Sequence, residues 1–157
     1  MRFLVIGYGN PLRTDDRFGL SVADRLKSRI DNNSTTSVYS CQQLLPEHVH
    51  MMKDCDWLIM VDASHQTPQG ELRVRRVSGR TMQSGNPSHH MSPDDLIALA
   101  KSMECKPRHA LLVTAGGFSF EAGETMTLGT SVLAEQVAQE LTERISRLAM
   151  DGESASC

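Results

Sequence analysis

The chain has 157 residues, of which 39% are hydrophobic and 22% charged, with a formal net charge of −3. These values fit one globular domain and argue against disorder. The chain has no clustered Lys and Arg run of the kind that nucleic acid attracts, and no apolar run approaching the roughly 18 residues of a membrane span, so we expect neither a nucleic-acid nor a membrane partner.

The N-terminal half alternates strands and helices. Residues 3–6 form a continuous apolar run followed by Gly-Tyr-Gly, which predicts a buried parallel strand. Apolar residues four positions apart then predict an amphipathic helix: Phe18, Val22, Leu26 and Ile30. Residues 36–41 predict a second strand, and Pro46 marks a position where another helix could start. The apolar run at 57–61 predicts a third strand, with Asp62 at its carboxyl end.

The C-terminal half continues the alternation. Residues 71–77 alternate apolar and charged side chains, which predicts an edge strand or a half-exposed strand. Residues 78–90 have no period and are expected to form a long loop. Ser92 is a good N-cap for a helix that begins at Pro93, and residues 110–113 predict a strand. The last helix is expected over about 130–150, with one apolar stripe: Leu133, Val137, Leu141, Ile145 and Leu148.

This order predicts an α/β fold in three layers, a mostly parallel twisted sheet with helices on both faces. We expect one domain over residues 1–150, followed by a disordered tail at 151–157. Ligands of such sheets bind beyond the carboxyl ends of the strands. That rule selects three places: residues 7–16, Asp62, and the end of the loop that contains His89.

The segment after the first strand reads Gly-Tyr-Gly-Asn-Pro-Leu-Arg-Thr-Asp-Asp over residues 7–16. It begins like a dinucleotide-binding loop, but Leu12 occupies the third glycine position, and Asp15 and Asp16 would repel a pyrophosphate. A nucleotide-binding regulator is therefore disfavoured. Either acid could cap the following helix, which would leave the other free to face a cleft.

Two carboxylates and one imidazole could meet at this edge of the sheet. Such a set suits a divalent ion such as zinc or nickel and leaves positions open for water or substrate. Taken alone, Asp62 is more often a residue that caps a loop amide, and a lone histidine is more often a surface or capping group. His89 and His90 are adjacent, so in an extended segment their side chains point to opposite sides.

Conventional nucleophile patterns are missing from the sequence, which has no G-x-S-x-G, no H-E-x-x-H and no P-loop. The four cysteines are scattered, and we expect reduced thiols in a cytoplasmic protein: Cys41, Cys55, Cys105 and Cys157. None of them is predicted at a helix N-terminus that would lower its pKa, so a cysteine nucleophile is disfavoured.

These segments resemble the endopeptidases that mature nickel–iron hydrogenases. Residues 7–16, followed by Phe18-Gly19, look like the signature G-x-G-N-x-L-x-x-D-D/E-x-x-G of that family. The strand end Val61-Asp62-Ala63 looks like its second motif, and residues 89–93, His-His-Met-Ser-Pro, look like its third. The resemblance covers roughly residues 2–148. Residues 42–47 are similar to the branch that serves bidirectional, NAD-linked hydrogenases.

The resemblance implies that Asp16, Asp62 and His89 form a catalytic and metal-binding triad, with His89 favoured over His90 by the register of the following helix. It also implies an aspartic-type endopeptidase that cuts a C-terminal extension from the precursor of a hydrogenase large subunit. The metal would be nickel supplied by that precursor, with no organic cofactor, and the protein would be a cytoplasmic monomer. Many relatives carry an Asp-Gly-Gly-type turn where this chain has Cys41-Gln42-Gln43.

Several mechanisms and functions stay open at this point. A resident metal could activate water, or the carboxylates could act as general base without metal. The same three residues could also belong to a non-catalytic nickel-sensing or chaperone-like module that binds the precursor without cutting it.

Overall fold

The structure, a computed structural model, describes residues 1–30, 35–79 and 91–154. Within this part of the chain, five strands form one sheet in the order β2-β1-β3-β5-β4. The strands are β1 (Phe3–Tyr8), β2 (Thr36–Cys41), β3 (Trp57–Ser64), β4 (Leu72–Arg76) and β5 (His109–Gly116). The helices are α1 (Phe18–Arg29), α2 (Pro93–Ser102) and α3 (Leu128–Ser154), with two 3-10 helices, η1 (Thr14–Arg17) and η2 (Pro46–Met52).

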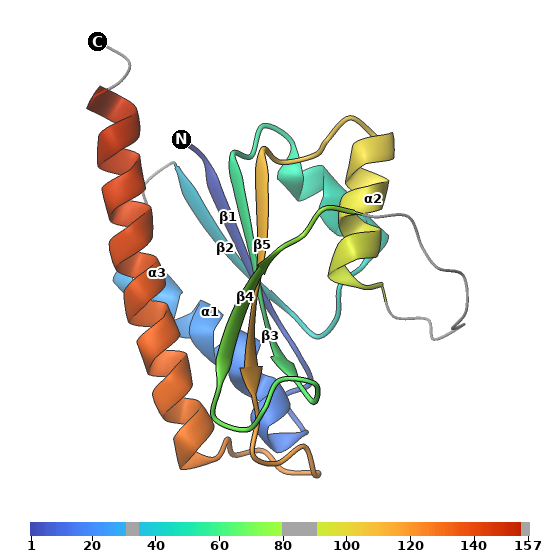
Figure 1. Cartoon of the computed structure of the whole chain (residues 1–157), viewed down its shortest axis with the longest axis vertical. Helices are drawn as coiled ribbons and strands as arrows, with labels where there is room; N and C mark the ends of the chain where they lie inside the picture. Colours follow the sequence, from blue (N-terminus) through green and yellow to red (C-terminus); the bar gives the residue numbers. More distant parts are fainter. Residues whose placement is uncertain (31–34, 80–90, 155–157) are drawn as a thin grey trace.

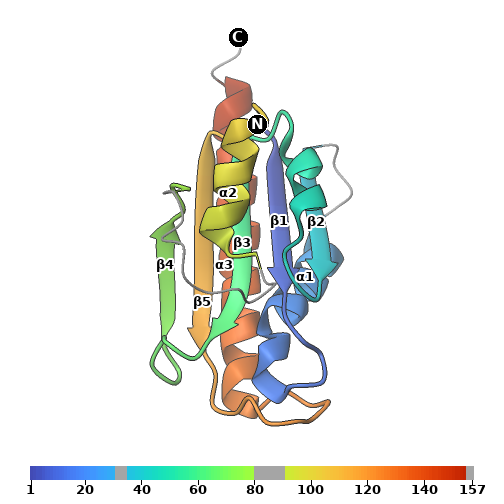
Figure 2. The ribbon, with the colours of Figure 1, turned by 90° about the vertical axis from the view of Figure 1, so that its right-hand side faces the viewer.

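Helices cover both faces of the sheet (Figures 1 and 2). Helices α1 and α3 pack on one face, and α2 and η2 pack on the other. Successive side chains of a strand point to opposite faces. Accordingly Phe3 and Val5 of β1 enter the core under α1 and α3, whereas Leu4 and Ile6 enter the core under α2 and η2. The predicted three-layer α/β fold is confirmed.

The chain changes direction across the sheet between β1 and β3. Strand β1 pairs in parallel with β2 on one side and with β3 on the other. The connection from β1 to β2 contains α1, and the connection from β2 to β3 contains η2 on the opposite face. Open α/β sheets bind ligands at such a switch point, beyond the carboxyl ends of the two strands. Here those ends carry residues 9–16 and Asp62.

Helix α1 lies directly against the two strands at the switch point. A Cβ atom added at Gly19 would lie 2.2 Å from the carbonyl oxygen of Val61 and 2.5 Å from that of Tyr8. Only a glycine permits this approach of helix to strand. The close packing fixes η1, the single turn that precedes α1, next to the end of β3.

Some elements differ from the sequence-based expectation. The segment at Pro46 is a 3-10 helix. Strand β4 lies at the edge of the sheet as expected, but it pairs antiparallel with β5. Helix α3 begins at Leu128 and continues to Ser154, so residues 151–154 belong to the helix rather than to the expected disordered tail. Most of the expected 78–90 loop, with residues 80–90, and the last residues, 155–157, lie outside the described residues.

Two further expectations concern the membrane and the cysteines. In the ranges that the structure describes, no helix is long and apolar enough to span a membrane. Cys41, Cys55 and Cys105 are free thiols. Cys157 lies outside the described residues.

Candidate functional site

Asp16 and Asp62 line one cavity of about 370 Å³ beyond the ends of β1 and β3. Asp16 comes from η1 and Asp62 from β3, 46 positions later in the sequence. We call this space the carboxylate cavity. Gln42 and Gln43, which follow β2, and Met91, which precedes α2, complete its wall. The structure therefore brings together the two carboxylates that the sequence selected.

Asp16 is held by a tight loop. Its Oδ2 accepts a hydrogen bond from the backbone amide of Asn10 at 2.7 Å, and the side-chain oxygen of Asn10 accepts one from the amide of Leu12 at 2.9 Å. Gly9 has a φ of 148°, and a Cβ atom there would lie 1.9 Å from the carbonyl oxygen of Asp16. The second glycine of the Gly-Tyr-Gly segment is thus needed to close the loop around Asp16.

Asp15 has a different role from its neighbour. It is fully buried and accepts hydrogen bonds from the amides of Phe118 at 2.7 Å, Ser119 at 3.1 Å and Thr127 at 2.7 Å. Burial alone would raise its pKa, but the Thr127 hydroxyl and these three amides outweigh burial and lower it. Asp15 therefore joins η1 to the segment between β5 and α3. Its partner Thr127 lies at the N-terminus of α3, so the helix that Asp15 supports is α3 and not α1.

Asp62 is crowded by a like charge. Burial and the negative charge of Asp16 raise the pKa of Asp62 to about 7, against the opposing effect of hydrogen bonds with the Tyr8 side chain and the Ala63 backbone. Burial and the nearby Asp62 also raise the pKa of Tyr8, so its hydroxyl stays protonated and donates to the carboxylate. A bound cation would relieve the repulsion between the two acids, and the pKa of Asp62 also suits a general base near neutral pH.

His89 and His90 lie outside the described residues. Within residues 1–30, 35–79 and 91–154, no three His, Cys, Asp or Glu side chains are grouped so as to hold a metal ion. Met91 follows His90 directly in the sequence and lines the carboxylate cavity. The approach of His89 to Asp16 and Asp62 stays a prediction.

Two of the thiols that the structure describes, those of Cys41 and Cys55, are poor nucleophiles. Burial raises the pKa of Cys41 to about 11 and that of Cys55 to about 11. A thiol with such a pKa is almost entirely protonated at neutral pH, and the thiolate is the reactive form. Cys41 and Cys55 are therefore poor candidates for a catalytic nucleophile.

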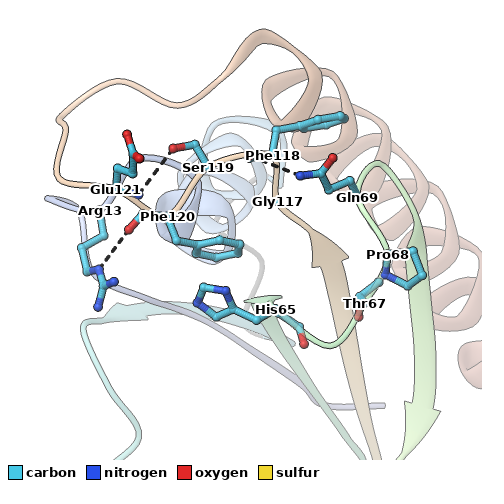
Figure 3. Close-up of a pocket in the computed structure, with 11 residues that line it drawn as sticks. Arg13, His65, Thr67, Pro68, Gln69, Gly117, Phe118, Ser119, Phe120 and Glu121 are labelled. Carbon is cyan, nitrogen blue, oxygen red and sulfur yellow. Dashed lines mark hydrogen bonds between the residues drawn. The ribbon is translucent and has the colours of Figure 1, made fainter.

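A second, larger cavity adjoins the first and was not predicted from the sequence. It has a volume of about 690 Å³ and is lined by Ser64 at the end of β3, by residues 65 and 67–69 after that strand, and by residues 117–121 after β5 (Figure 3). We call it the aromatic cavity, because the rings of His65, Phe118 and Phe120 line it. Arg13 lines both cavities. The residues of the aromatic cavity lie mostly in connecting segments, which have no periodic pattern. The only sequence signal for this cavity is the pair of nearby phenylalanines, Phe118 and Phe120.

No family model matches the chain, and no curated protein matches its sequence. Solved structures do match its fold. A nickel–iron hydrogenase maturation protease, HycI, from Thermococcus kodakarensis KOD1 has a TM-score of 0.77 and 23% identity, with 90% of each chain covered.

Two structures from Escherichia coli are similarly close. The hydrogenase maturating endopeptidase HybD has a TM-score of 0.76 and 21% identity, covering 94% of this chain and 93% of that one. A further endopeptidase, solved in solution, has a TM-score of 0.76 and 22% identity, covering 93% of this chain and 94% of that one. The present chain thus has, over nearly its whole length, the fold of solved hydrogenase maturation proteases.

Proposed function

We propose that this chain is an endopeptidase that removes a C-terminal extension from the nickel-loaded precursor of a nickel–iron hydrogenase large subunit. The observation that carries the proposal is the meeting of Asp16 and Asp62 in one cavity at the switch point of this particular fold. The motifs around Asp16, Asp62 and His89, in the same order as in the family that the sequence resembles, support it independently.

In this proposal the metal is part of the substrate. Asp16, Asp62 and His89 are the ligands that this chain offers, and the donor chemistry of two oxygens and one nitrogen fits nickel or zinc. A cation beside the two acids would offset the repulsion between Asp16 and Asp62 and would favour the deprotonated form of Asp62. Cutting would then depend on correct loading, because the precursor itself supplies the ion that completes the site.

A divalent ion supplies Lewis acidity toward a peptide carbonyl. The residues of this chain contribute position and electrostatics. The Asn10 amide fixes the carboxylate of Asp16, and the Tyr8 hydroxyl is bonded to that of Asp62. Both acids therefore face the substrate from rigid elements, η1 and β3.

The resemblance of residues 42–47 further suggests service to a bidirectional, NAD-linked hydrogenase. Gln42, Gln43 and Leu44 line the carboxylate cavity, so they are placed to contact the substrate near the cut. Co-expression with precursors from NAD-linked and from other nickel–iron hydrogenases tests this assignment. We expect processing of the first kind, and equal processing of both kinds would contradict it.

The central experiment incubates the purified protein with nickel-loaded and nickel-free precursor, followed by mass spectrometry. We expect a shortened large subunit and one released peptide from the loaded precursor only. Binding without shortening would instead support the non-catalytic nickel-sensing module. Equal cutting of both precursors would point to a resident metal or to metal-free carboxylate catalysis.

The triad has its own test. His89→Ala and Asp62→Asn should each abolish processing while leaving the fold intact, and His90→Ala should be milder, because adjacent side chains in an extended segment point to opposite sides. A His89→Ala protein that still processes loaded precursor at the wild-type rate would remove His89 from the ligand set. The double variant of His89 and His90 then shows whether His90 has taken its place.

A further inference from the structure

The aromatic cavity lies next to the carboxylate cavity along the edge of the sheet. The carboxylate cavity lies beyond the ends of β1 and β3, and the aromatic cavity beyond the ends of β3 and β5. Ser64, which ends β3 and lines the aromatic cavity, is two residues beyond Asp62 on the same strand. Two residues of extended chain span about 7 Å. A peptide held at Asp62 would therefore reach the aromatic cavity within two or three residues of its own length.

Arg13 stands at the boundary between the two cavities. Its Nε donates to the carbonyl oxygen of Phe120 at 3.2 Å, which fixes the guanidinium over the segment that follows β5 (Figure 3). The side chain is exposed and lines both cavities. The donors of a guanidinium that are not used in this bond suit peptide carbonyl or carboxylate oxygens.

The wall of the aromatic cavity offers ring faces with polar groups around them. The rings of His65 and Phe120 lie with their centroids 3.8 Å apart and their planes tilted by 35°. Phe118 is 44% exposed. A Cβ atom added at Gly129 would lie 2.6 Å from the Phe118 ring, so that ring is packed closely against the backbone at the start of α3. Fixed, exposed rings of this kind bind apolar side chains without a large entropy cost.

Charge around the cavity is balanced. Arg13 contributes a positive charge and Glu121 a negative one, and Ser64, Gln69 and Ser119 add neutral polar groups. A nucleotide or another strongly anionic ligand would favour an excess of cations. Mixed polarity around aromatic rings is instead suited to a stretch of polypeptide.

We propose that the aromatic cavity binds the C-terminal extension of the precursor, with an apolar side chain of the first residues after the cut packed on His65, Phe118 and Phe120. The proposal rests on the proposed endopeptidase function and names the subsite for the released peptide. The metal-bearing side of the substrate must reach Asp16 and Asp62 itself. The aromatic cavity, on the other side of Arg13, is therefore available to the extension. The released peptide can dissociate from it after the cut.

The test measures KM and kcat for processing of nickel-loaded precursor. His65→Ala and Phe118→Ser should each raise KM about three- to tenfold, the range expected for loss of one aromatic contact, with kcat within about twofold of the wild type. Both side chains are exposed, so the variants should fold, and thermal unfolding verifies this. Gln66→Ala is the matched control, since Gln66 is exposed beside His65 and is not part of either cavity wall.

A change in the precursor tests which of its side chains contacts the rings of the aromatic cavity. A precursor with serine in place of the apolar residues among the first three positions of its extension should show the same rise in KM with the wild-type protein. The substrate change should have a smaller effect on the His65→Ala protein than on the wild type, because the contact with His65 is already absent from that variant. Fully additive effects, or an unchanged KM in both variants, would overturn the subsite while leaving the endopeptidase function in place. Failure of the wild type to shorten loaded precursor would overturn both.

Discussion

Asp15 and Asp16 are neighbours with opposite roles. Asp15 is buried and receives hydrogen bonds from the segment before α3, whereas Asp16 lines the carboxylate cavity. The sequence indicated that one of the two acids could be structural and the other could face a cleft, but it placed the structural acid at the following helix, α1, whereas Asp15 binds the segment before α3. That depends on the turn of η1 and on a contact between residues more than 100 positions apart, and no local pattern encodes either.

This division predicts opposite phenotypes for two conservative variants. Asp15→Asn should lower the free energy of unfolding by about 2–4 kcal/mol, because an amide nitrogen would face backbone donors that now meet a carboxylate. Asp16→Asn should change stability by less than about 1 kcal/mol, since its carbonyl oxygen can still accept from Asn10, but it should abolish processing. Urea unfolding and the precursor assay measure the two effects. Equal losses of stability would contradict the assignment.

The lowered pKa of Asp15 adds a pH dependence. Because the folded state holds this carboxyl group in its charged form more strongly than the unfolded state does, its stabilisation is present above the unfolded pKa of about 4 and is lost as the pH falls through the folded pKa. The stability difference between the wild type and Asp15→Asn should therefore shrink in acid. A difference that stays constant from pH 7 to pH 3 would show that the charge of Asp15 is not what stabilises the fold.

Asp62 has the reverse dependence. Its pKa is about 7 in the folded chain and about 4 in the unfolded chain, so the folded state binds the proton more tightly and stability falls as the pH rises between these values. At about 1.36 kcal/mol per pKa unit, this loss is at most roughly 4 kcal/mol. Asp62→Asn should therefore be more stable than the wild type at pH 8 and similar to it at pH 4, by thermal unfolding of metal-free protein. A variant that is less stable at pH 8 would disprove the crowding of Asp62.

At the scale of elements, the strands were predictable because their composition is strongly apolar. The β1 and β3 segments are continuous apolar runs, and the alternation of residues 71–77 correctly indicated an edge strand. The connection from β3 to β4 is too short for a crossover to a parallel strand, so the antiparallel direction of β4 could have been predicted. Its pairing with β5 rather than with β3 could not, because no local pattern specifies the neighbouring strand. The 3-10 form of η2 was also missed, since Pro46 marks a helix start without specifying the kind of helix.

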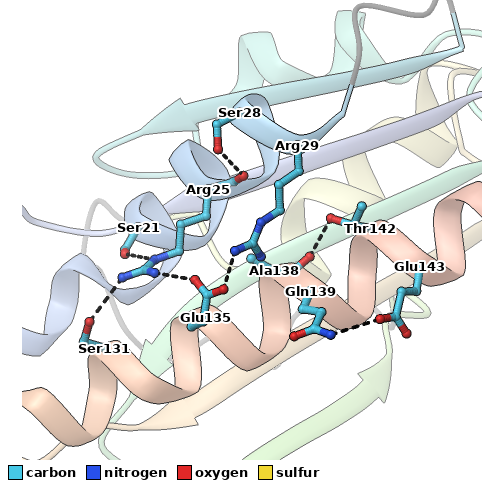
Figure 4. Close-up of polar contacts among 10 residues, drawn as sticks. All are labelled: Ser21, Arg25, Ser28, Arg29, Ser131, Glu135, Ala138, Gln139, Thr142 and Glu143. Atoms are coloured by element: carbon cyan, nitrogen blue, oxygen red, sulfur yellow. Dashed lines mark hydrogen bonds and ion pairs between the residues drawn. The ribbon is translucent and has the colours of Figure 1, made fainter.

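Helices α1 and α3 are joined by a polar contact on one face of the sheet (Figure 4). Glu135 of α3 forms ion pairs with Arg25, at 2.5 Å, and with Arg29 of α1. Hydrogen bonds from Arg29 and Arg25 lower the pKa of Glu135. These side chains are partly exposed, so solvent and salt weaken their attraction.

Replacing Glu135 should therefore have a small, salt-dependent effect. Glu135→Gln should lower Tm by about one to three degrees at low ionic strength, and the difference should largely disappear in about 1 M NaCl. Glu143→Gln, on an exposed position of the same helix, is the control for removal of one negative charge. An effect of Glu135→Gln that persists in high salt would indicate packing rather than charge.

At the scale of the whole molecule, both candidate sites lie at one edge of the sheet. This edge carries the carboxyl ends of the parallel strands. The carboxylate cavity and the aromatic cavity both lie there, and both include Arg13. Sequence motifs located the first cavity, because its acids follow predicted strands. They did not locate the second, whose residues meet only because the segments after β3 and β5 fold over the same edge. The contact of Tyr8 with Asp62 was likewise invisible until the two strands were placed side by side.

The folded protein should bind free nickel at the carboxylate cavity. If Asp16 and Asp62 bind a divalent ion, millimolar Ni²⁺ should raise the Tm of tag-free protein, because an ion that binds the folded state stabilises it by mass action. Protons compete with the metal at Asp62, whose pKa is about 7, so the increase in Tm should be larger at pH 8 than at pH 6.

Asp16→Asn should abolish this increase, whereas Asp24→Asn, a change of an exposed acid in α1, should leave it intact. An increase of the same size in the Asp16→Asn protein would mean that nickel binds elsewhere, for example at surface histidines. Titratable histidines would also produce a pH dependence, so the variant rather than the pH profile distinguishes the two explanations. An increase in Tm that persists in Asp24→Asn and is lost in Asp16→Asn would identify the carboxylate cavity as the place where the metal binds this chain.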